Sequence, residues 1–457
     1  MLHRVMLALG LTLFPMVTFP MVALAAGEAE EFFLDNGMQV VVIQDNRVPV
    51  VTHMVWYRVG AADEPAGQSG IAHFVEHLMF KATDDMASGE FSQVVEANGG
   101  SDNAFTSWDY TGYFQRVASD RLGLMMQMEA DRMRDLVFDP VEVDTERSVI
   151  LEERAQRTDS SAGGLFNEQM RAALFLNHPY GTPIIGWRHE METLGINEAR
   201  AFYDTWYHPN NAILIVAGDV TVDEVRALAE QHYGPIPAFD ALPDRARPQE
   251  PPHIADRRLN FADERVANPY VSIQMLAPVR EPGDQAEAAA LVYLADILGG
   301  SGQTSLLARR LQVEEQRSLY ASAFYDSTSV DPSGFTLINV PVPGVSLEEA
   351  EADLWRIIDE FLAEGIDADQ FARIQFRIQA GEIYAEDNAQ GLARAYGTEL
   401  TTGLSITDVE SWTETLSAVT PDDVMAAAHR LFDDPSTVTG YLMRPDTPQA
   451  AALEVSQ

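Results

Sequence analysis

The sequence contains no cysteine, which excludes disulfide bonds and every metal site built on thiolates. A chain of 457 residues without such links must be held by its apolar core, and its hydrophobic fraction of 46% is that of a globular protein. Lysine is nearly missing as well, since Lys81 is the only one. The chain carries 70 acidic against 30 basic residues, a formal net charge of −40. A surface of this charge repels nucleic acids and anionic membranes, so neither is expected as a partner.

Long apolar runs are confined to the N-terminus. Residues 5–24 form one, interrupted by Pro15 and Pro20, and Ala23-Leu24-Ala25 gives it a cleavage site of the A-x-A type. We therefore expect residues 1–25 to be a secretory signal peptide. A membrane anchor is the alternative, which the prolines and the cleavage site disfavour. No later stretch approaches the length of a membrane span, and the predicted location is the periplasm of a Gram-negative bacterium, or the medium after secretion.

Helix and strand patterns mix along the rest of the chain, with strands arriving in pairs. This favours an α+β fold over regular βαβ alternation. A strand follows a helix at 212–218 and again at 437–443, which indicates a pseudo-repeat of about 200 residues. We predict two similar mixed domains, each a mainly antiparallel sheet with helices packed on it, joined by a proline-rich linker. The predicted bounds are 26–233 for the N-terminal domain, 234–257 for the linker, 258–446 for the C-terminal domain and 447–457 for a tail.

One short motif carries the chemistry of the first predicted domain. His73 and His77 stand four residues apart in His73-Phe74-Val75-Glu76-His77. On the helix predicted over 71–80, positions i, i+3 and i+4 share a face, so both imidazoles can bind one metal ion beside Glu76. This H-x-x-E-H order is the inverse of the commoner zinc-protease motif. The alternative, a helix with unrelated polar residues, is disfavoured by the rarity of the pattern. The second domain lacks the motif, so one metal ion per chain is expected.

A catalytic zinc takes three protein ligands and keeps one position for water. The helix predicted over 141–156 offers Glu146 and Glu153, which lie seven residues apart on nearly one face, while Glu152 points about 100° away. We expect Val149 and the residues near it to set the inward face of this helix. The helix pattern leaves both Glu146 and Glu153 open as the third ligand.

The same segments resemble a known family of zinc peptidases. They are G-x-A-H-F-x-E-H-x-x-F-K-x-T from Gly70 and E-R-S-V-I-x-E-E from Glu146, with shorter ones at 103–106, 178–180, 207–211 and 218–219. They resemble the insulinase/pitrilysin family, M16, which includes mitochondrial processing peptidase, and the chain is similar to its half-length bacterial members. The resemblance covers about residues 30–445 and implies two related domains. One departure is Ala82, where the family usually has glycine.

The resemblance implies roles for the acidic residues. The family's third ligand is the glutamate seven positions after the Glu of the E-R pair, which is Glu153 here. Glu146 then lies behind a ligand histidine and orients its imidazole without binding the metal. In the family's mechanism Zn²⁺ lowers the pKa of its bound water to about 7 and polarises the scissile carbonyl. Glu76 takes the proton of the water and passes it to the leaving amine.

The resemblance also implies substrate contacts. Asn103, Ala104 and Thr106 lie on a predicted edge strand that the family pairs with extended peptides. Active members carry an arginine and a tyrosine seven apart in the C-terminal half, which hold substrate and stabilise the oxyanion. Tyr320 matches the catalytic tyrosine, but Val313 stands in the place of the arginine. A packed strand tyrosine is the alternative for Tyr320. We therefore predict that this chain is the zinc subunit of a heterodimer whose partner supplies the Arg/Tyr pair.

The leading hypothesis is an exported zinc endopeptidase that hydrolyses peptides or unfolded polypeptide segments. One alternative is a peptide-binding scaffold or chaperone-like subunit that does not cleave. Another is a metal-binding protein without hydrolysis. A complete set of His73, Glu76, His77 and Glu153 argues against the scaffold, and a metal-binding protein has no use for Glu76.

Overall fold

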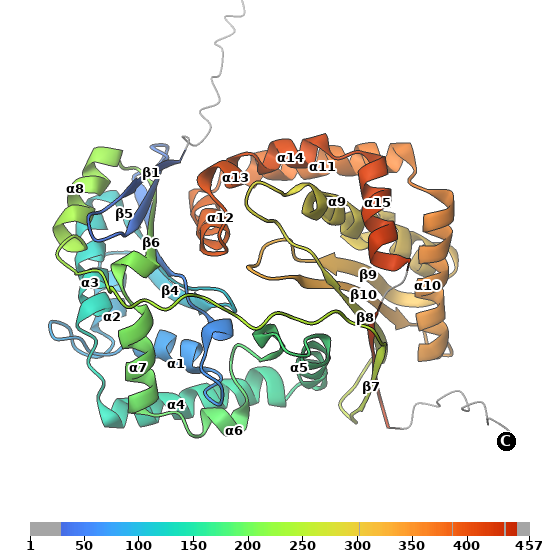
Figure 1. Cartoon of the computed structure of the whole chain (residues 1–457), viewed down its shortest axis with the longest axis horizontal. Coiled ribbons are helices and arrows are strands. Elements are labelled where there is room, and N and C mark those ends of the chain that lie inside the picture. Colours follow the sequence, from blue (N-terminus) through green and yellow to red (C-terminus); the bar gives the residue numbers. More distant parts are fainter. Residues whose placement is uncertain (1–28, 301, 386, 434–435, 446–457) are drawn as a thin grey trace, which may run out of the picture.

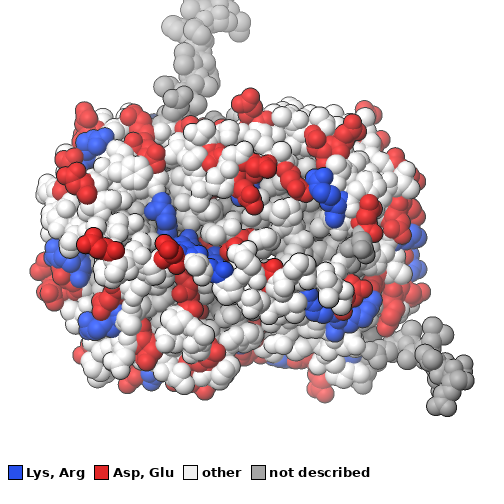
Figure 2. All heavy atoms as spheres, in the orientation of Figure 1, with Lys and Arg blue, Asp and Glu red and all other residues white. Residues whose placement is uncertain are grey.

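The structure, a computed structural model, describes residues 29–300, 302–385, 387–433 and 436–445. The predicted signal peptide at 1–25 and the predicted tail at 447–457 lie outside these residues. The described chain folds into two halves that lie side by side, each containing one sheet and its covering helices (Figure 1). On the face shown in Figure 2, acidic side chains spread over both halves and do not gather in one patch.

The first sheet has six strands in the order β1-β2-β6-β3-β5-β4. β2 and β6 run parallel, and the other neighbours run antiparallel. β2, β3 and β6 are apolar along nearly their whole length because helices cover both faces of the sheet. β4 is an edge. The strands are β1 (Glu30–Phe33), β2 (Gln39–Gln44), β3 (Val50–Tyr57), β4 (Ser101–Thr106), β5 (Thr111–Ala118) and β6 (Ala212–Gly218).

The second sheet has five strands in the order β7-β11-β8-β10-β9, with β7 and β11 parallel and the rest antiparallel. Position by position this repeats the order β2-β6-β3-β5-β4 of the first sheet, so the prediction of two similar, mainly antiparallel domains is confirmed. In the repeat, β9 takes the edge position that β4 has in the first sheet. The strands are β7 (Arg257–Ala262), β8 (Tyr270–Ala277), β9 (Ser318–Tyr325), β10 (Ser333–Pro341) and β11 (Val438–Met443).

Helices cover both sheets. Those of the first half are α1 (Ile71–Leu78), α2 (Glu90–Ala97), α3 (Leu122–Arg134), α4 (Pro140–Arg154), α5 (Ala162–Leu174), α6 (Arg188–Met191), α7 (Ile196–Trp206) and α8 (Val222–His232). Those of the second half are α9 (Ala286–Ala295), α10 (Leu347–Glu364), α11 (Ala368–Ala385), α12 (Ala389–Thr401), α13 (Ile406–Glu410), α14 (Trp412–Ala418) and α15 (Pro421–Phe432). No helix in the described ranges is long and apolar enough to cross a bilayer.

Each half of the chain supplies a helix to the sheet of the other half. α12 lies between the halves in Figure 1 and packs Ala393, Tyr396 and Leu400 against the first sheet, around Trp56. In return, α5 packs on β7, β8 and β11 of the second sheet, where Phe166 joins a shared apolar cluster. Burial of apolar surface therefore holds the halves together in addition to the covalent linker.

The linker between α8 and β7 runs across the molecule in extended form (Figure 1). Arg247 anchors it, since its guanidinium lies 2.9 Å from Asp63 Oδ1, 2.5 Å from Asp109 Oδ1 and 3.4 Å from Asp331 Oδ2. The first two carboxylates belong to one half and the third to the other. Arg245 donates to Asp63 as well, at 3.0 Å. The linker is therefore pinned by buried ion pairs along part of its path.

Candidate metal centre

The motif helix α1 is fixed at its start by a sharp turn. Gly70 has a φ of +88°, which favours glycine, and a Cβ there would lie 2.1 Å from Met191 Sδ. Glu64 accepts hydrogen bonds from the N–H groups of Gly70 and Ala72, at 2.9 and 3.0 Å, which satisfies the free end of the helix. The apolar side of α1 enters the core through Ile71, Phe74, Val75 and Leu78. The polar motif residues are left on the side that faces α4 and β4.

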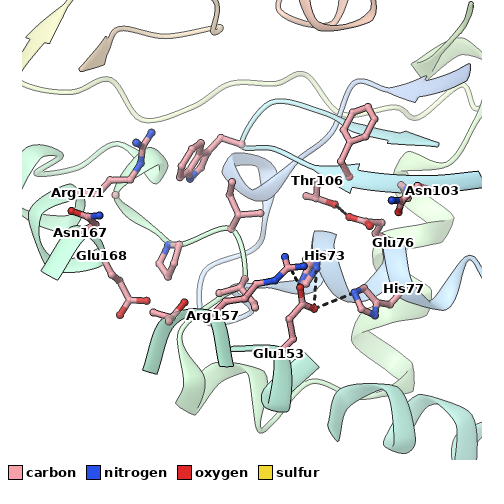
Figure 3. A pocket seen from close by; sticks show the side chains of 18 of the residues that line it. His73, Glu76, His77, Asn103, Thr106, Glu153, Arg157, Asn167, Glu168 and Arg171 are labelled. Atoms are coloured by element: carbon pink, nitrogen blue, oxygen red, sulfur yellow. Dashed lines mark hydrogen bonds and ion pairs between the residues drawn. The ribbon is translucent and has the colours of Figure 1, made fainter. Parts of the chain in front are cut away.

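The structure brings His73, His77 and Glu153 together (Figure 3). Oε2 of Glu153, near the end of α4, lies 3.7 Å from His73 Nε2 and 3.5 Å from His77 Nε2. One ligand atom from each side chain lies within 4.8 Å of the others. The neighbouring Glu152 is exposed and contacts Gln156 instead, at 2.9 Å. Of the carboxylates on α4, Glu153 is the one that faces both imidazole Nε2 atoms.

This geometry fits zinc. Two ligands that each lie about 2.0–2.1 Å from a tetrahedral zinc are roughly 3.4 Å from one another, close to the distances from Glu153 to the two histidines. Two imidazoles and one carboxylate are also a donor set that catalytic zinc sites use, with a fourth position left for water. His73, His77 and Glu153 could therefore hold a zinc ion without rearrangement of the backbone.

Glu146, about two turns earlier on α4, contacts the other nitrogen of His77. Its Oε1 lies 2.8 Å from His77 Nδ1, and its Oε2 pairs with Lys81, the single lysine of the chain. Burial alone would raise the pKa of Glu146, but the hydrogen bonds from His77 and Lys81 outweigh it and lower the pKa. Burial likewise works against the charged form of His77, yet the bond to Glu146 and the nearby carboxylates raise its pKa. An ionised Glu146 therefore holds the proton of His77 on Nδ1 and turns Nε2 toward Glu153.

His73 and Glu76 are buried beside each other. Burial, and then the charges of His77 and Arg157, lower the pKa of His73 to about 3, so its imidazole is neutral at physiological pH. Burial raises the pKa of Glu76, against the effect of a hydrogen bond that Thr106 Oγ1 donates to its Oε2 at 2.5 Å. A neutral imidazole can bind a metal ion, and a carboxylate with a raised pKa is a stronger base.

The metal centre opens into a cavity of about 860 Å³. Edge strand β4 lines it with Asn103, Ala104 and Thr106, so all three predicted substrate-binding residues lie there. Figure 3 shows Arg171, Asn167 and Glu168 of α5 at the other end of the cavity from the metal-binding trio. Most of the wall comes from the first half of the chain, and Gln274 of β8 adds a side chain from the second half.

Some functional residues lie elsewhere or were not predicted. Tyr320 lies on the second edge strand β9, 43% exposed, and is not among the residues that line the cavity. Arg157, Arg171 and Gln274 line it but carry no sequence motif. The nearest sequence signal is the position of Arg157 one helical turn after Glu153, which allows their ion pair of 2.6 Å.

Comparison with known proteins places the chain among peptidases. The model of insulinase (peptidase family M16) matches residues 39–187, and that of the peptidase M16 inactive domain matches residues 193–378. The chain is 27% identical over 417 residues to the zinc protease PqqE of Helicobacter pylori, covering 90% of this chain and 92% of that protein. It is 30% identical over 411 residues to an uncharacterized zinc protease of Mycobacterium leprae, covering 88% of each. The crystal structure of a protease from Helicobacter pylori superposes with a TM-score of 0.85 at 26% identity, covering 92% of this chain and 100% of that one.

Proposed function

This chain belongs to the insulinase family of peptidases, family M16, and from that premise we propose that it is a zinc-dependent endopeptidase that cleaves peptides or unfolded polypeptide segments. The observation that carries the proposal is the convergence of His73 Nε2 and His77 Nε2 on one oxygen of Glu153. A zinc ion held by these side chains, one per chain, would polarise the carbonyl of a peptide bond and acidify water.

Glu76 is the proposed general base. Its position on α1 puts it beside the two histidines, while the hydrogen bond from Thr106 fixes one of its oxygens. Burial raises its pKa, which favours uptake of a proton from the attacking water and its delivery to the leaving amine. Thr106 thus has a positioning role in the proposal in addition to its place on the substrate strand.

An extended peptide is proposed to add to the free edge of β4. The backbone N–H of Ala104 donates to the side-chain oxygen of its neighbour Asn103, at 2.8 Å. This N–H could bond to a peptide carbonyl once the Asn103 amide turns away. Pairing through the backbone binds with little regard to sequence, and it needs a substrate that presents an extended strand. Peptides and unfolded segments meet that need.

A second, related subunit is proposed to complete the active site. Val313, seven residues before Tyr320, is an exposed apolar side chain that cannot donate a hydrogen bond to an oxyanion. Within this chain the metal centre and base are therefore assembled without the Arg/Tyr pair of active family members. A partner that carries both residues would supply the missing hydrogen-bond donors. Tyr320 could then take part in catalysis only within the complex of the two subunits. Co-purification of a related chain with this one tests the proposal, and full activity of the monomer would contradict it.

Export to the periplasm is proposed from the apolar segment at 5–24 and the small residues that follow it. The absence of cysteine fits this location, since no thiol is exposed to oxidation there. Fractionation of the producing cells, with an antibody against the folded domains, tests the location.

Replacement of Glu76 with glutamine separates the peptidase from a scaffold that binds peptides without cleavage. The variant is expected to keep one zinc ion per chain, measured by elemental analysis, and to lose cleavage by about 10²- to 10⁴-fold. Undiminished cleavage would remove Glu76 as the base. If the wild-type protein, zinc-loaded and with its partner, binds extended peptides but cleaves none, the scaffold is the correct function.

A further inference from the structure

The cavity contains one arginine that no carboxylate neutralises. Arg171 of α5 is half-buried, and its guanidinium carbon lies 3.5 Å from the centroid of the Trp108 ring. Its Nε donates to the backbone oxygen of Tyr180 at 2.8 Å. Among the described residues, no carboxylate oxygen lies within ion-pair distance of it. A free cation is unexpected in a chain with a net charge of −40.

The neighbouring charges of the cavity are already paired. Glu168 binds Arg154 through two hydrogen bonds, at 2.8 and 3.1 Å, and Arg157 binds Glu153 at 2.6 Å. Burial lowers the pKa of Arg171 to about 10, while the nearest acidic groups act on it only through space. Arg171 therefore remains charged at neutral pH without a partner for that charge.

The contacts of Arg171 hold its guanidinium in a fixed plane. The stack on Trp108 and the bond from Nε leave both terminal nitrogens free, and these form the planar fork that binds carboxylates through two parallel hydrogen bonds. Asn167, one helical turn earlier on α5, and Gln274 of β8 line the same cavity. Neither side-chain amide has a hydrogen-bond partner among the described residues. The cation and the two neutral amides offer a carboxylate several hydrogen-bond donors, and the neighbouring Glu168 is already paired with Arg154.

We propose that Arg171, Asn167 and Gln274 form a carboxylate-binding subsite that selects peptides with an acidic group at one fixed distance from the scissile bond. The group is either an Asp or Glu side chain or the C-terminal carboxylate of the peptide. This proposal rests on the proposed peptidase function, because the subsite shares its cavity with the metal centre (Figure 3). The net negative charge of the protein repels every peptide that carries one acidic residue to a similar extent. The subsite is therefore recognised by tighter binding of the peptide whose acidic group stands at one particular position.

The test measures peptide binding to the zinc-loaded Glu76→Gln protein, which needs no cleavage. Fluorescent peptides of one length carry a single Glu at each position in turn, and each is made with a C-terminal acid and with an amide. One position, or the free C-terminus, is expected to bind about ten- to a hundred-fold more tightly than its neutral counterpart. Adding Arg171→Met should abolish the difference, and Arg171→Glu should reverse it in favour of Lys. Arg226→Met is the control, since Arg226 also stacks on a ring, that of Phe32 at 3.7 Å, far from the site.

A second variant keeps the proposal testable if substitutions of Arg171 prevent folding. Asn167 is exposed, so Asn167→Asp should fold normally, and its carboxylate would pair with Arg171 and remove the preference. A response to internal Glu assigns the subsite to side chains, and a response to the acid–amide pair alone assigns it to the C-terminus. Equal binding of all peptides, or an undiminished preference in folded Arg171→Met, overturns the proposal. A positional preference in binding, together with no cleavage by the zinc-loaded wild type in the presence of its partner, would instead overturn the peptidase function and leave the subsite standing.

Discussion

Nδ1 of His77 lies 2.8 Å from Oε1 of Glu146, so a carboxylate on α4 sets the orientation of an imidazole on α1. The same carboxylate binds Lys81 through its other oxygen. Glu146→Gln is therefore expected to weaken zinc binding by about 10- to 100-fold, because the amide no longer stabilises the proton on Nδ1. Competition with a chromophoric chelator at fixed pH measures the change.

Glu152→Gln is the matched control for Glu146→Gln. Glu152 is on the same helix, next to Glu153, but its side chain is exposed and accepts a hydrogen bond from Gln156. Its zinc affinity should match that of the wild type. Equal affinities for both variants would show that Glu146 has no part in holding the metal.

The buried Glu76 should make the metal-free protein less stable than its glutamine variant. Burial raises the pKa of Glu76 in the folded state above the 4.5 of an exposed carboxyl, so ionisation costs folding free energy. That cost is complete above the folded pKa and vanishes below about pH 4.5, where both states are protonated. Thermal unfolding of Glu76→Gln in chelator should thus show a raised midpoint at neutral pH and a gain that shrinks toward pH 4. A gain that grows on acidification would contradict the raised pKa.

The repeat of two similar domains could be predicted from the sequence, but the strand order of the sheets and the exchange of helices could not. Strand 212–218 is a continuous apolar run, and its counterpart near 437–443 is rich in β-branched and large apolar residues, so both patterns are local. α12 contains Gly391 and Gly397, which weaken any helix prediction, and its apolar face is buried on the sheet of the other half. A local sequence pattern does not show that a helix packs on a sheet that is distant in the sequence. Strand β7 has no distinct signal in the sequence either, because it directly follows the proline-rich linker.

At the site, residue spacing predicted which side chains share one face of a helix. It did not predict the cavity residues that come from other elements, such as Arg171 and Gln274. The trio His73, His77 and Glu153 comes together as the motif and the family resemblance indicated. The prediction that Val149 and the residues near it set the inward face of α4 is wrong for Val149 itself, which is 45% exposed, while the adjacent Ile150 is fully buried. Both are aliphatic, and two charged residues of α4, Glu146 and Arg154, are buried through pairing, so hydrophobicity alone could not separate them.

Loss of Arg247 should destabilise the whole molecule. Its side chain is 4% exposed and bridges Asp63 and Asp109 to Asp331, so Arg247→Met would leave carboxylates buried without their main partner. The expected cost is about 3–5 kcal/mol, measured as a lowered unfolding midpoint. Arg265→Met removes an exposed pair with Asp263 and should leave the unfolding midpoint nearly unchanged. Similar midpoints for the two variants would mean that the buried ion pairs of the linker do not stabilise the fold.

Gly397 of α12 lies directly against Trp56, and a Cβ there would come within 2.0 Å of the indole. Trp56 is fully buried and packs edge-on against Phe105, with ring centroids 4.8 Å apart. Gly397→Ala should therefore cost about 1–3 kcal/mol through overpacking. Since Phe105 lies on β4 and lines the cavity, the displaced indole should also raise KM for peptides more than it lowers kcat.

Gly381→Ala on α11 is the opposite case within the same protein. No atom lies within 4 Å of a Cβ at that position, so alanine adds helix propensity without a clash and should stabilise the protein by about 0.5–1 kcal/mol. Thermal unfolding and peptide kinetics of the two variants, measured side by side, separate packing from propensity. Equal stability of Gly397→Ala and Gly381→Ala, with an unchanged KM, would contradict the packing of α12 on the first sheet. The second half of the chain would then have no part in holding β4 in position.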